Sequence, residues 1–198
     1  MNIFGIFDGY AQEIQKNLST GLSTEHTHRS ALKKLIESLG DGIQAINEPR
    51  RVECGSPDYV ITISDIPIGY IEAKDVGTNL NREERSEQMT RYRDTLPNLI
   101  LTDYIEFRWF LDGELKETAR IGNLSRDLKI KKAEDGINAV ANLINGFLAQ
   151  EMPIVGRADD LARRMANSAR MLCDAIESTF KQEGENEKLH AQIKAFKE

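Results

Sequence analysis

Apolar residues at the start of the chain recur every three or four positions, which is typical of one face of a helix. Over the first twenty residues this face consists of Ile6, Phe7, Tyr10, Ile14 and Leu18. A second helix is expected from a start signal at Ser23 or Thr24 to Gly40, because serine and threonine cap helix N-termini and glycine ends helices. A short strand is predicted between Ile43 and Ile46.

The middle of the chain contains two short runs rich in β-branched residues, a composition that favours strands. These runs are residues 59–63 and 68–73. The intervening Ser64-Asp65-Ile66-Pro67 has the composition of a turn, so we expect the two strands to pair as an antiparallel hairpin.

A helix and three further strands are predicted after this hairpin. The helix covers about residues 83–96 and ends before a proline, because the residue that precedes a proline disfavours helical geometry. Residues 98–102 form an apolar run that is typical of a buried strand. Two more strands, 106–111 and 114–121, flank Asp112-Gly113, a dipeptide that tight hairpin turns prefer.

Strand signals end at about Asp127, and the patterns that follow are helical. These helical segments are 134–148, 157–180 and 186–196. We therefore expect an α/β domain with an N-terminal helix in residues 1–127 and a helical extension in residues 128–198. The last helical segment is followed by Lys197-Glu198 without a stop signal, which suggests a chain cut from a longer polypeptide, although a fraying terminus gives the same pattern.

The composition is that of an ordinary globular protein: 40% of the residues are hydrophobic and 29% are charged. The apolar runs are far too short to cross a bilayer, and the N-terminus lacks the basic start and long apolar stretch of a signal peptide. We therefore expect a cytoplasmic protein without a membrane partner. The two cysteines, Cys54 and Cys173, lie far apart and are interpreted as reduced and incidental.

Three ionisable residues occupy the ends of the predicted hairpin. Asp58 begins its first strand, and Glu72 and Lys74 lie near the end of its second. Antiparallel pairing brings these two ends together, and residues two apart on a strand point to the same face. We therefore expect two carboxylates and one ammonium group to converge at one edge of the sheet.

This set of groups suits the hydrolysis of phosphodiester bonds. Mg²⁺ prefers carboxylate oxygens, acidifies the attacking water and stabilises charge on phosphate oxygens. Lys74 would either orient or deprotonate that water, or stay protonated and stabilise the transition state as a cation, and the sequence does not choose between these roles. Such short motifs also occur by accident on solvated strands. Ionisable residues at the end of a buried strand are costly unless they are paired or bind metal, which favours the functional interpretation.

Pro57-Asp58 followed by Glu72-Ala73-Lys74, on this order of elements, resembles the PD-(D/E)XK nuclease superfamily. The string Gln88-Met89-Thr90-Arg91-Tyr92 looks like the Q-x-x-x-Y element of several of its branches. The resemblance implies a restriction-endonuclease-like core, αβββαβ, with a central mixed sheet flanked by helices. It also implies that Gln88 and Tyr92, which share one helical face, position the scissile strand or a catalytic lysine. On spacing alone, a solvated glutamine and a half-buried tyrosine would explain the same pattern.

The resemblance further implies a glutamate on the first core helix that completes the metal site with Asp58 and Glu72. Glu25, at the start of that predicted helix, is the candidate, and Glu37 on the same helix is the alternative. A glutamate in the first turn also complements the helix dipole, so Glu25 has a purely structural interpretation as well. The expected cofactor is Mg²⁺, for which Mn²⁺ substitutes.

Longer stretches resemble the N-terminal nuclease module of single-chain restriction-modification enzymes, in which a nuclease is fused to an adenine methyltransferase. These stretches are residues 25–29, 53–61, 69–74 and 96–104. The resemblance implies double-stranded DNA as the substrate, with methyltransferase and target-recognition domains in the same longer polypeptide. No dinucleotide-type Gly-rich loop and no Asn/Asp-Pro-Pro-Tyr motif is present in the sequence. Whether two modules dimerise to cut both strands stays open.

The net charge of −6 weighs against a chain that binds DNA strongly by itself, because such proteins usually present a strong basic surface. We expect a metal-dependent endonuclease module of a bacterial restriction-modification enzyme, which relies on other domains to hold its substrate. The alternatives are a DNA repair or recombination nuclease with the same active site, and a non-catalytic docking domain that keeps the nuclease fold. The intact set of Asp58, Glu72 and Lys74 argues against the docking domain.

Overall fold

The computed structural model describes residues 3–20, 25–47 and 55–150. The chain divides into two compact units, Met1–Met152 and Pro153–Glu198. The second unit lies outside the described residues, and so do the two C-terminal helices predicted from the sequence. The boundary expected after residue 127 falls inside the first unit, because the helix that follows it packs on the sheet.

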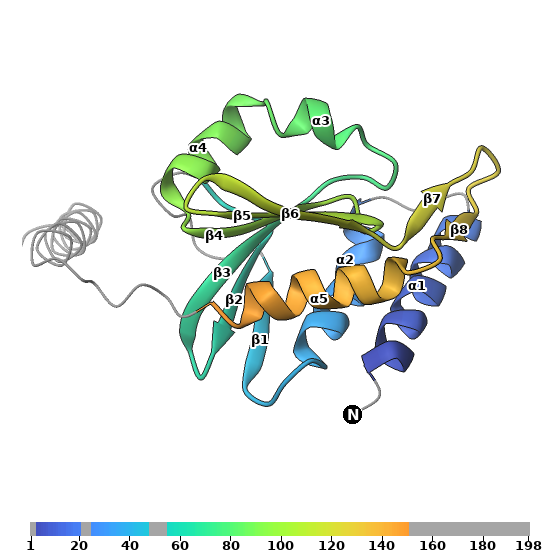
Figure 1. Cartoon of the computed structure of the whole chain (residues 1–198), viewed down its shortest axis with the longest axis horizontal. Coiled ribbons are helices and arrows are strands. Elements are labelled where there is room, and N and C mark those ends of the chain that lie inside the picture. Colours follow the sequence, from blue (N-terminus) through green and yellow to red (C-terminus); the bar gives the residue numbers. More distant parts are fainter. Residues whose placement is uncertain (1–2, 21–24, 48–54, 151–198) are drawn as a thin grey trace, which may run out of the picture. The chain divides into compact units, whose positions relative to one another are not determined.

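A central sheet of six strands organises the first unit (Figure 1). Its strands, in the same order in space and in sequence, are β1 (Ile43–Asn47), β2 (Tyr59–Ile63), β3 (Ile66–Ala73), β4 (Asn98–Thr102), β5 (Glu106–Leu111) and β6 (Glu114–Arg120). β3 and β4 are parallel and the other neighbouring pairs are antiparallel, so the sheet is mixed. A parallel pair requires a crossover, which contains α3 (Leu80–Glu83) and α4 (Glu87–Thr95).

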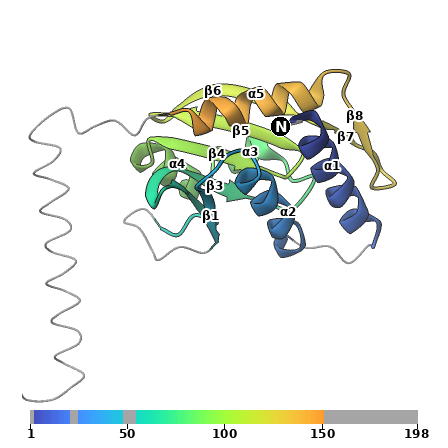
Figure 2. The same cartoon turned by 90° about the horizontal axis from the view of Figure 1, so that it is seen from below.

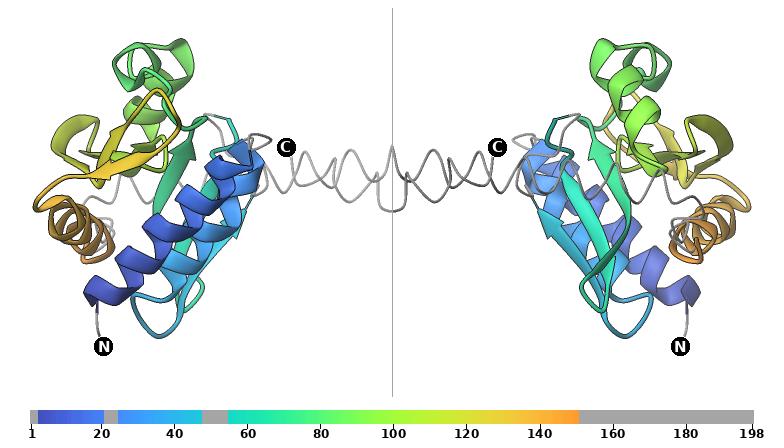
Figure 3. Two further views of the ribbon diagram at one scale, coloured as in Figure 1. Left: turned by 90° about the vertical axis from the view of Figure 1, so that its right-hand side faces the viewer. Right: turned by 90° about the vertical axis from the view of Figure 1, so that its left-hand side faces the viewer.

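Helices cover both faces of this sheet. α1 (Ile3–Ser19), α2 (Glu25–Glu37) and α5 (Gly136–Leu148) lie on one face, and α3 and α4 lie on the other (Figure 1). α5 runs along β5 and β6 (Figure 2), and α1 and α2 lie side by side (Figure 3). Among the described residues, no helix is long and apolar enough to span a membrane. The arrangement confirms the predicted α/β fold class with a mixed sheet flanked by helices.

Each face of the sheet has its own apolar core, because successive side chains of a strand point to opposite faces. Ile100 of β4 contributes to the larger core, which it shares with side chains of α1, α2 and α5. Its neighbours Leu99 and Leu101 contribute to the smaller core, together with Tyr92 of α4. All five residues of β4 are buried, as its continuous apolar run predicted.

The hairpin between β2 and β3 has a tighter turn than expected. Ser64 and Asp65 both have positive φ, 50° and 66°, so the turn has two residues instead of four. Ile66 and Pro67 therefore belong to β3, which begins earlier than predicted. Pro67 is accommodated by a register shift between Ile61 and Thr62 of β2, since proline occurs in strands mainly at edges and bulges.

The helix predicted over residues 83–96 starts too early, because α4 begins only at Glu87 and the separate helix α3 ends at Glu83. The Ser86 hydroxyl accepts a hydrogen bond from the Met89 backbone N–H at 3.2 Å and caps α4. Asn79 caps α3 in the same way. Serine in a helix interior competes with the backbone for hydrogen bonds, so it starts a new helix here. This start places Gln88 near the beginning of α4.

A small second sheet was not predicted. β7 (Gly122–Leu124) and β8 (Ile130–Lys132) pair as antiparallel strands, although no strand was expected after Asp127. Three residues are too few for a periodic apolar pattern to appear in the sequence. α5, by contrast, begins within two residues of its predicted start and ends at its predicted end.

Candidate functional site

The predicted site lies where β2 begins and β3 ends. Tyr59 pairs with Ile71 in the antiparallel register, so Asp58 and Glu72, each one residue further out, lie on adjacent strands. Lys74 follows two residues after Glu72, and its backbone N–H continues the pairing of β3 with β4 beyond the end of β3. The hairpin register thus brings the two acidic positions together.

Asp58 is held through both of its carboxylate oxygens. Oδ1 accepts a hydrogen bond from Nη2 of Arg29 on α2 at 2.6 Å, and the two side chains are only 14% and 11% exposed. Oδ2 accepts from the backbone N–H of Ala73 at 2.9 Å. The Asp58 carboxylate is therefore fixed against the end of β3, next to the residue that follows Glu72.

Glu72 is buried, with 3% of its surface exposed. Its Oε1 accepts a hydrogen bond from Nζ of Lys74 at 2.7 Å, while its Oε2 has no hydrogen-bond partner among the described residues. Burial raises the pKa of Glu72, repulsion from Asp58 raises it further, and attraction to Lys74 opposes the shift, so that the pKa is about 7. Buried polar atoms are nearly always paired. Oε2 of Glu72, which no described residue pairs with, could therefore accept a hydrogen bond or bind a cation.

The raised pKa of Glu72 predicts that the metal-free protein becomes less stable as pH rises. A carboxyl group with a raised folded-state pKa stabilises the fold while protonated, and this contribution is lost between about pH 4.5 and about pH 7. Over that range the wild type should lose about 3 kcal/mol of unfolding free energy relative to Glu72→Gln, which does not titrate. Urea unfolding of both proteins in EDTA measures the difference. Parallel pH dependences would show that Glu72 does not titrate in this way.

Lys74 connects the carboxylates to α4. Burial by itself lowers the pKa of Lys74, but attraction to Glu72 and Asp58 outweighs it and raises the pKa above its usual value. Nζ donates to Oε1 of Gln88 at 3.2 Å, and Nε2 of Gln88 donates to the Tyr92 hydroxyl at 3.2 Å. Tyr92 is buried in the smaller core. A chain of hydrogen bonds thus leads from Glu72 to a fixed tyrosine, and the lysine is protonated at neutral pH in the metal-free site.

The two glutamates considered as a third metal ligand have different positions on α2. Glu37 lies at the C-terminal end of α2, where its Oε1 accepts a hydrogen bond from the Ala45 backbone N–H at 3.1 Å, so it belongs to the junction with β1. Glu25 is the first residue of α2, and its side chain lies outside the described part of the structure. In that described part, no group of three or more His, Cys, Asp or Glu forms a metal site. Of the three proposed metal ligands, the structure describes the carboxylates of Asp58 and Glu72.

Arg29 is a site residue for which the sequence indicated no role. It lies four residues after Glu25 on the same predicted helix, so both belong to one helical face. That spacing was the available signal. It does not show that the arginine reaches a carboxylate 29 residues further along the chain.

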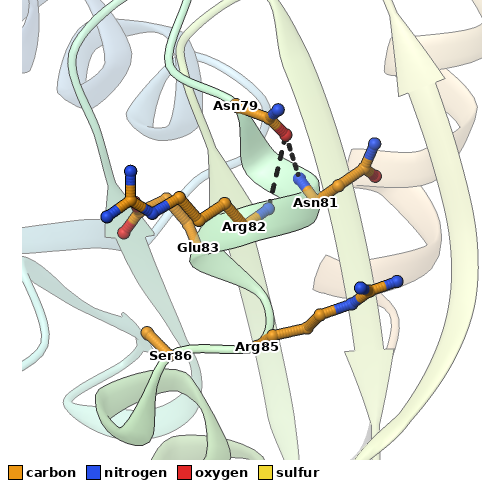
Figure 4. A pocket seen from close by; sticks show the side chains of 6 residues that line it. All are labelled: Asn79, Asn81, Arg82, Glu83, Arg85 and Ser86. Atoms are coloured by element: carbon orange, nitrogen blue, oxygen red, sulfur yellow. Dashed lines mark hydrogen bonds between the residues drawn. The ribbon is translucent and has the colours of Figure 1, made fainter.

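A separate pocket of about 650 Å³ lies at α3 and the start of α4 (Figure 4). It is lined by Asn79, Asn81, Arg82, Glu83, Arg85 and Ser86. Oδ1 of Asn79 accepts from the backbone N–H groups of Asn81 and Arg82 at 3.0 and 3.3 Å, which holds the first turn of α3 in place. The acidic residues and the lysine of the predicted site do not line this pocket.

Comparisons with known proteins bear on the fold. No family model matches the sequence, and no curated protein matches it significantly. Among solved structures, the chain is similar to one in a cryo-EM structure of a DrdV–DNA complex, with a TM-score of 0.60 and 22% sequence identity. The match covers 76% of this chain and 14% of that chain, so this chain spans a small part of that protein's length. Together with the mixed six-stranded sheet between two helical layers, this likeness identifies the fold of the first unit as restriction-endonuclease-like.

Proposed function

We propose that the chain is a Mg²⁺-dependent endodeoxyribonuclease module, which hydrolyses DNA phosphodiester bonds at the site formed by Asp58, Glu72 and Lys74. The observation that carries the proposal is the convergence of two carboxylates and a protonated lysine at one edge of the sheet. The similar solved structure is a complex with DNA, which supports DNA as the substrate.

The described residues include carboxylates that could bind a divalent cation, although they would supply only some of its ligands. Oε2 of Glu72 is buried without a hydrogen-bond partner among them, and Mg²⁺ prefers such carboxylate oxygens. A bound cation would also relieve the repulsion from Asp58 that raises the pKa of Glu72. Mg²⁺ usually keeps several waters and binds substrate phosphate, so a few carboxylates suffice. Glu25, at the start of α2, is the third ligand that we propose.

Bound Mg²⁺ supplies an acidified water and stabilises charge on the phosphate. Arg29 and the Ala73 N–H keep the Asp58 carboxylate in place before the cation arrives. Glu72 must be ionised to bind a cation, so metal affinity should rise with pH up to about 7. Mn²⁺ has the same preference for carboxylate oxygens and should substitute.

Lys74 contributes a positive charge beside these carboxylates. Of the two roles that the sequence leaves open, the raised pKa of Lys74 favours a protonated lysine that stabilises charge on the phosphate. Gln88 accepts a hydrogen bond from the ammonium group, and Tyr92 accepts one from Gln88. These two side chains restrict the orientation of the ammonium group.

The module would act as part of a bacterial restriction-modification polypeptide in the cytoplasm. The net charge of −6 favours a substrate held by other domains, since DNA binders that act alone usually present a basic surface. The similar solved chain is about seven times longer than the part matched, which leaves room for such domains there. Methyltransferase and target-recognition domains are the partners we propose, with pairing of two modules for cleavage of both strands.

Plasmid nicking tests the proposed activity. The wild-type chain, at a concentration high enough to offset weak DNA binding, should nick supercoiled plasmid in Mg²⁺ or Mn²⁺ and not in EDTA. Lys74→Met should cleave about 10²- to 10³-fold more slowly, because the charge that stabilises the phosphate is lost. Lys74→Arg should keep part of the activity if the residue acts as a cation, and should lose it if the residue deprotonates water.

Lys33→Met is the matched control, since Lys33 lies on the surface of α2 and its side chain is 43% exposed. It should cleave at the wild-type rate. If metal-dependent cleavage by the wild type does not exceed that of Lys74→Met, the nuclease proposal is wrong and a docking domain on the same fold is favoured.

A further inference from the structure

Arg29 is the counter-ion of Asp58 in the metal-free site. Its Nη2 donates to Oδ1 of Asp58 at 2.6 Å, and both side chains are mostly buried. The other Asp58 oxygen accepts from the Ala73 N–H. Both oxygens that a cation would use are therefore engaged, and one of them is engaged by a positive charge.

The backbone of Arg29 is fixed independently of this ion pair. The Tyr59 hydroxyl donates to the Arg29 carbonyl at 2.9 Å, and Tyr59 is fully buried. This bond anchors α2 to the first residue of β2. Separation of the guanidinium from Asp58 therefore requires rotation of the arginine side chain and no movement of the helix.

When Glu72 is ionised, the charges within the two ion pairs of the site cancel. Asp58 pairs with Arg29, and Glu72 pairs with Lys74. A divalent cation at the carboxylates would add two positive charges, and the guanidinium would repel it at short range. Glu25, the third ligand proposed above, would offset one of these charges, and an anionic DNA phosphate would offset the other.

We propose that Arg29 competes with the divalent cation for Asp58, and that metal binding transfers its guanidinium from Asp58 to a DNA phosphate. The inference rests on the proposed nuclease function and deepens it. Arginine suits the exchange because its planar guanidinium pairs with carboxylates and with phosphates in the same geometry. The exchange couples the two ligands: DNA strengthens metal binding by offering the guanidinium another partner, and the metal strengthens DNA binding equally.

Mn²⁺ binding in the absence of DNA, followed by electron paramagnetic resonance of the free ion, tests the competition. Arg29→Gln should bind Mn²⁺ about 10-fold more tightly than the wild type, because a positive charge beside the site is removed. Lys33→Gln removes an exposed positive charge one turn further along α2 and should leave the affinity unchanged. A structural role alone predicts the opposite sign for Arg29→Gln, since a displaced Asp58 would bind Mn²⁺ less well.

The coupling to DNA is a second measurement. A phosphorothioate duplex, which resists hydrolysis, should tighten Mn²⁺ binding in the wild type. The same duplex should tighten it less in Arg29→Gln, in which the guanidinium is missing. Equal effects in the two proteins would contradict the transfer to phosphate.

Several outcomes separate this inference from the proposed function. Equal or weaker Mn²⁺ binding by folded Arg29→Gln, with folding checked by thermal unfolding, overturns the competition. If the variant does not fold, the Nε–H resonance of Arg29 in the wild type should shift when Mg²⁺ is added without DNA, and an unchanged resonance overturns the competition too. Wild-type Mn²⁺ binding that Asp58→Asn does not weaken contradicts the proposed function instead.

Discussion

Asp58→Asn should slow Mg²⁺-dependent DNA cleavage by about 10³-fold or more, the largest effect expected of a single substitution at the site. The amide has the shape of the carboxylate and can still accept the hydrogen bond from the Ala73 N–H. It lacks the negative charge that attracts a cation, and it leaves Arg29 beside a neutral group. Single-turnover cleavage and Mn²⁺ affinity should therefore fall together.

Asp94→Asn is the matched control for this substitution. Asp94 lies on the exposed side of α4, so the same chemical change there should affect neither cleavage nor Mn²⁺ affinity. If Asp58→Asn cleaves DNA at the wild-type rate, Asp58 is not a metal ligand and the proposed mechanism fails. Thermal unfolding of both variants separates loss of the ligand from loss of the fold.

Asn98→Ala should lower the free energy of unfolding by about 4 kcal/mol, because three buried groups would lose their partners at once. The Asn98 amide nitrogen donates to the carbonyls of Ile68 and Phe147, at 2.7 and 3.0 Å. Its carbonyl oxygen accepts from the Trp109 indole at 2.8 Å. A single 2%-exposed side chain thus joins β3, β5 and α5 to β4. Urea unfolding in EDTA measures the loss.

Asn138→Ala on α5 provides the comparison for this loss. Asn138 is exposed, and within residues 3–20, 25–47 and 55–150 its side chain bonds only to nearby Asp135, so its replacement should change the unfolding free energy by about 0.5 kcal/mol or less. A similar loss for Asn98→Ala and Asn138→Ala would mean that the network around Asn98 does not stabilise the fold as the geometry implies.

Local sequence patterns were sufficient to predict the bounds of an element where that element is a long run of one residue type or has clear signals at both ends. β2, β4 and β5 have their predicted bounds because each is a β-branched, apolar or aromatic run between turn residues or beside a proline. The helix over residues 83–96 was predicted across the break at Ser86, because the polar residues from Glu83 to Gln88 give no apolar spacing that would mark where the helix begins. The preference of that serine for a capping position decided the break, and apolar spacing contains no information on it.

The candidate site also has a part that the sequence predicted and a part that it did not. The positions of Asp58, Glu72 and Lys74 at the ends of two strands follow from the hairpin, so the sequence alone was enough to select them. Their catalytic and metal-binding roles stay predictions. The ion pair with Arg29 was not predictable, because it joins α2 to the start of β2 across 29 residues and depends on how the helix packs against the sheet.

By itself, then, the sequence determined most of the strands and helices, apart from β7, β8 and the break at Ser86. It also determined which ionisable residues lie at the strand ends, because both depend on neighbours within a few positions. Only the tertiary structure decided that Glu72 is buried with a pKa of about 7, that Lys74 stays protonated, and that Asn98 joins three elements. Burial, charge and hydrogen bonding at these residues come from groups that packing brings together from distant parts of the chain.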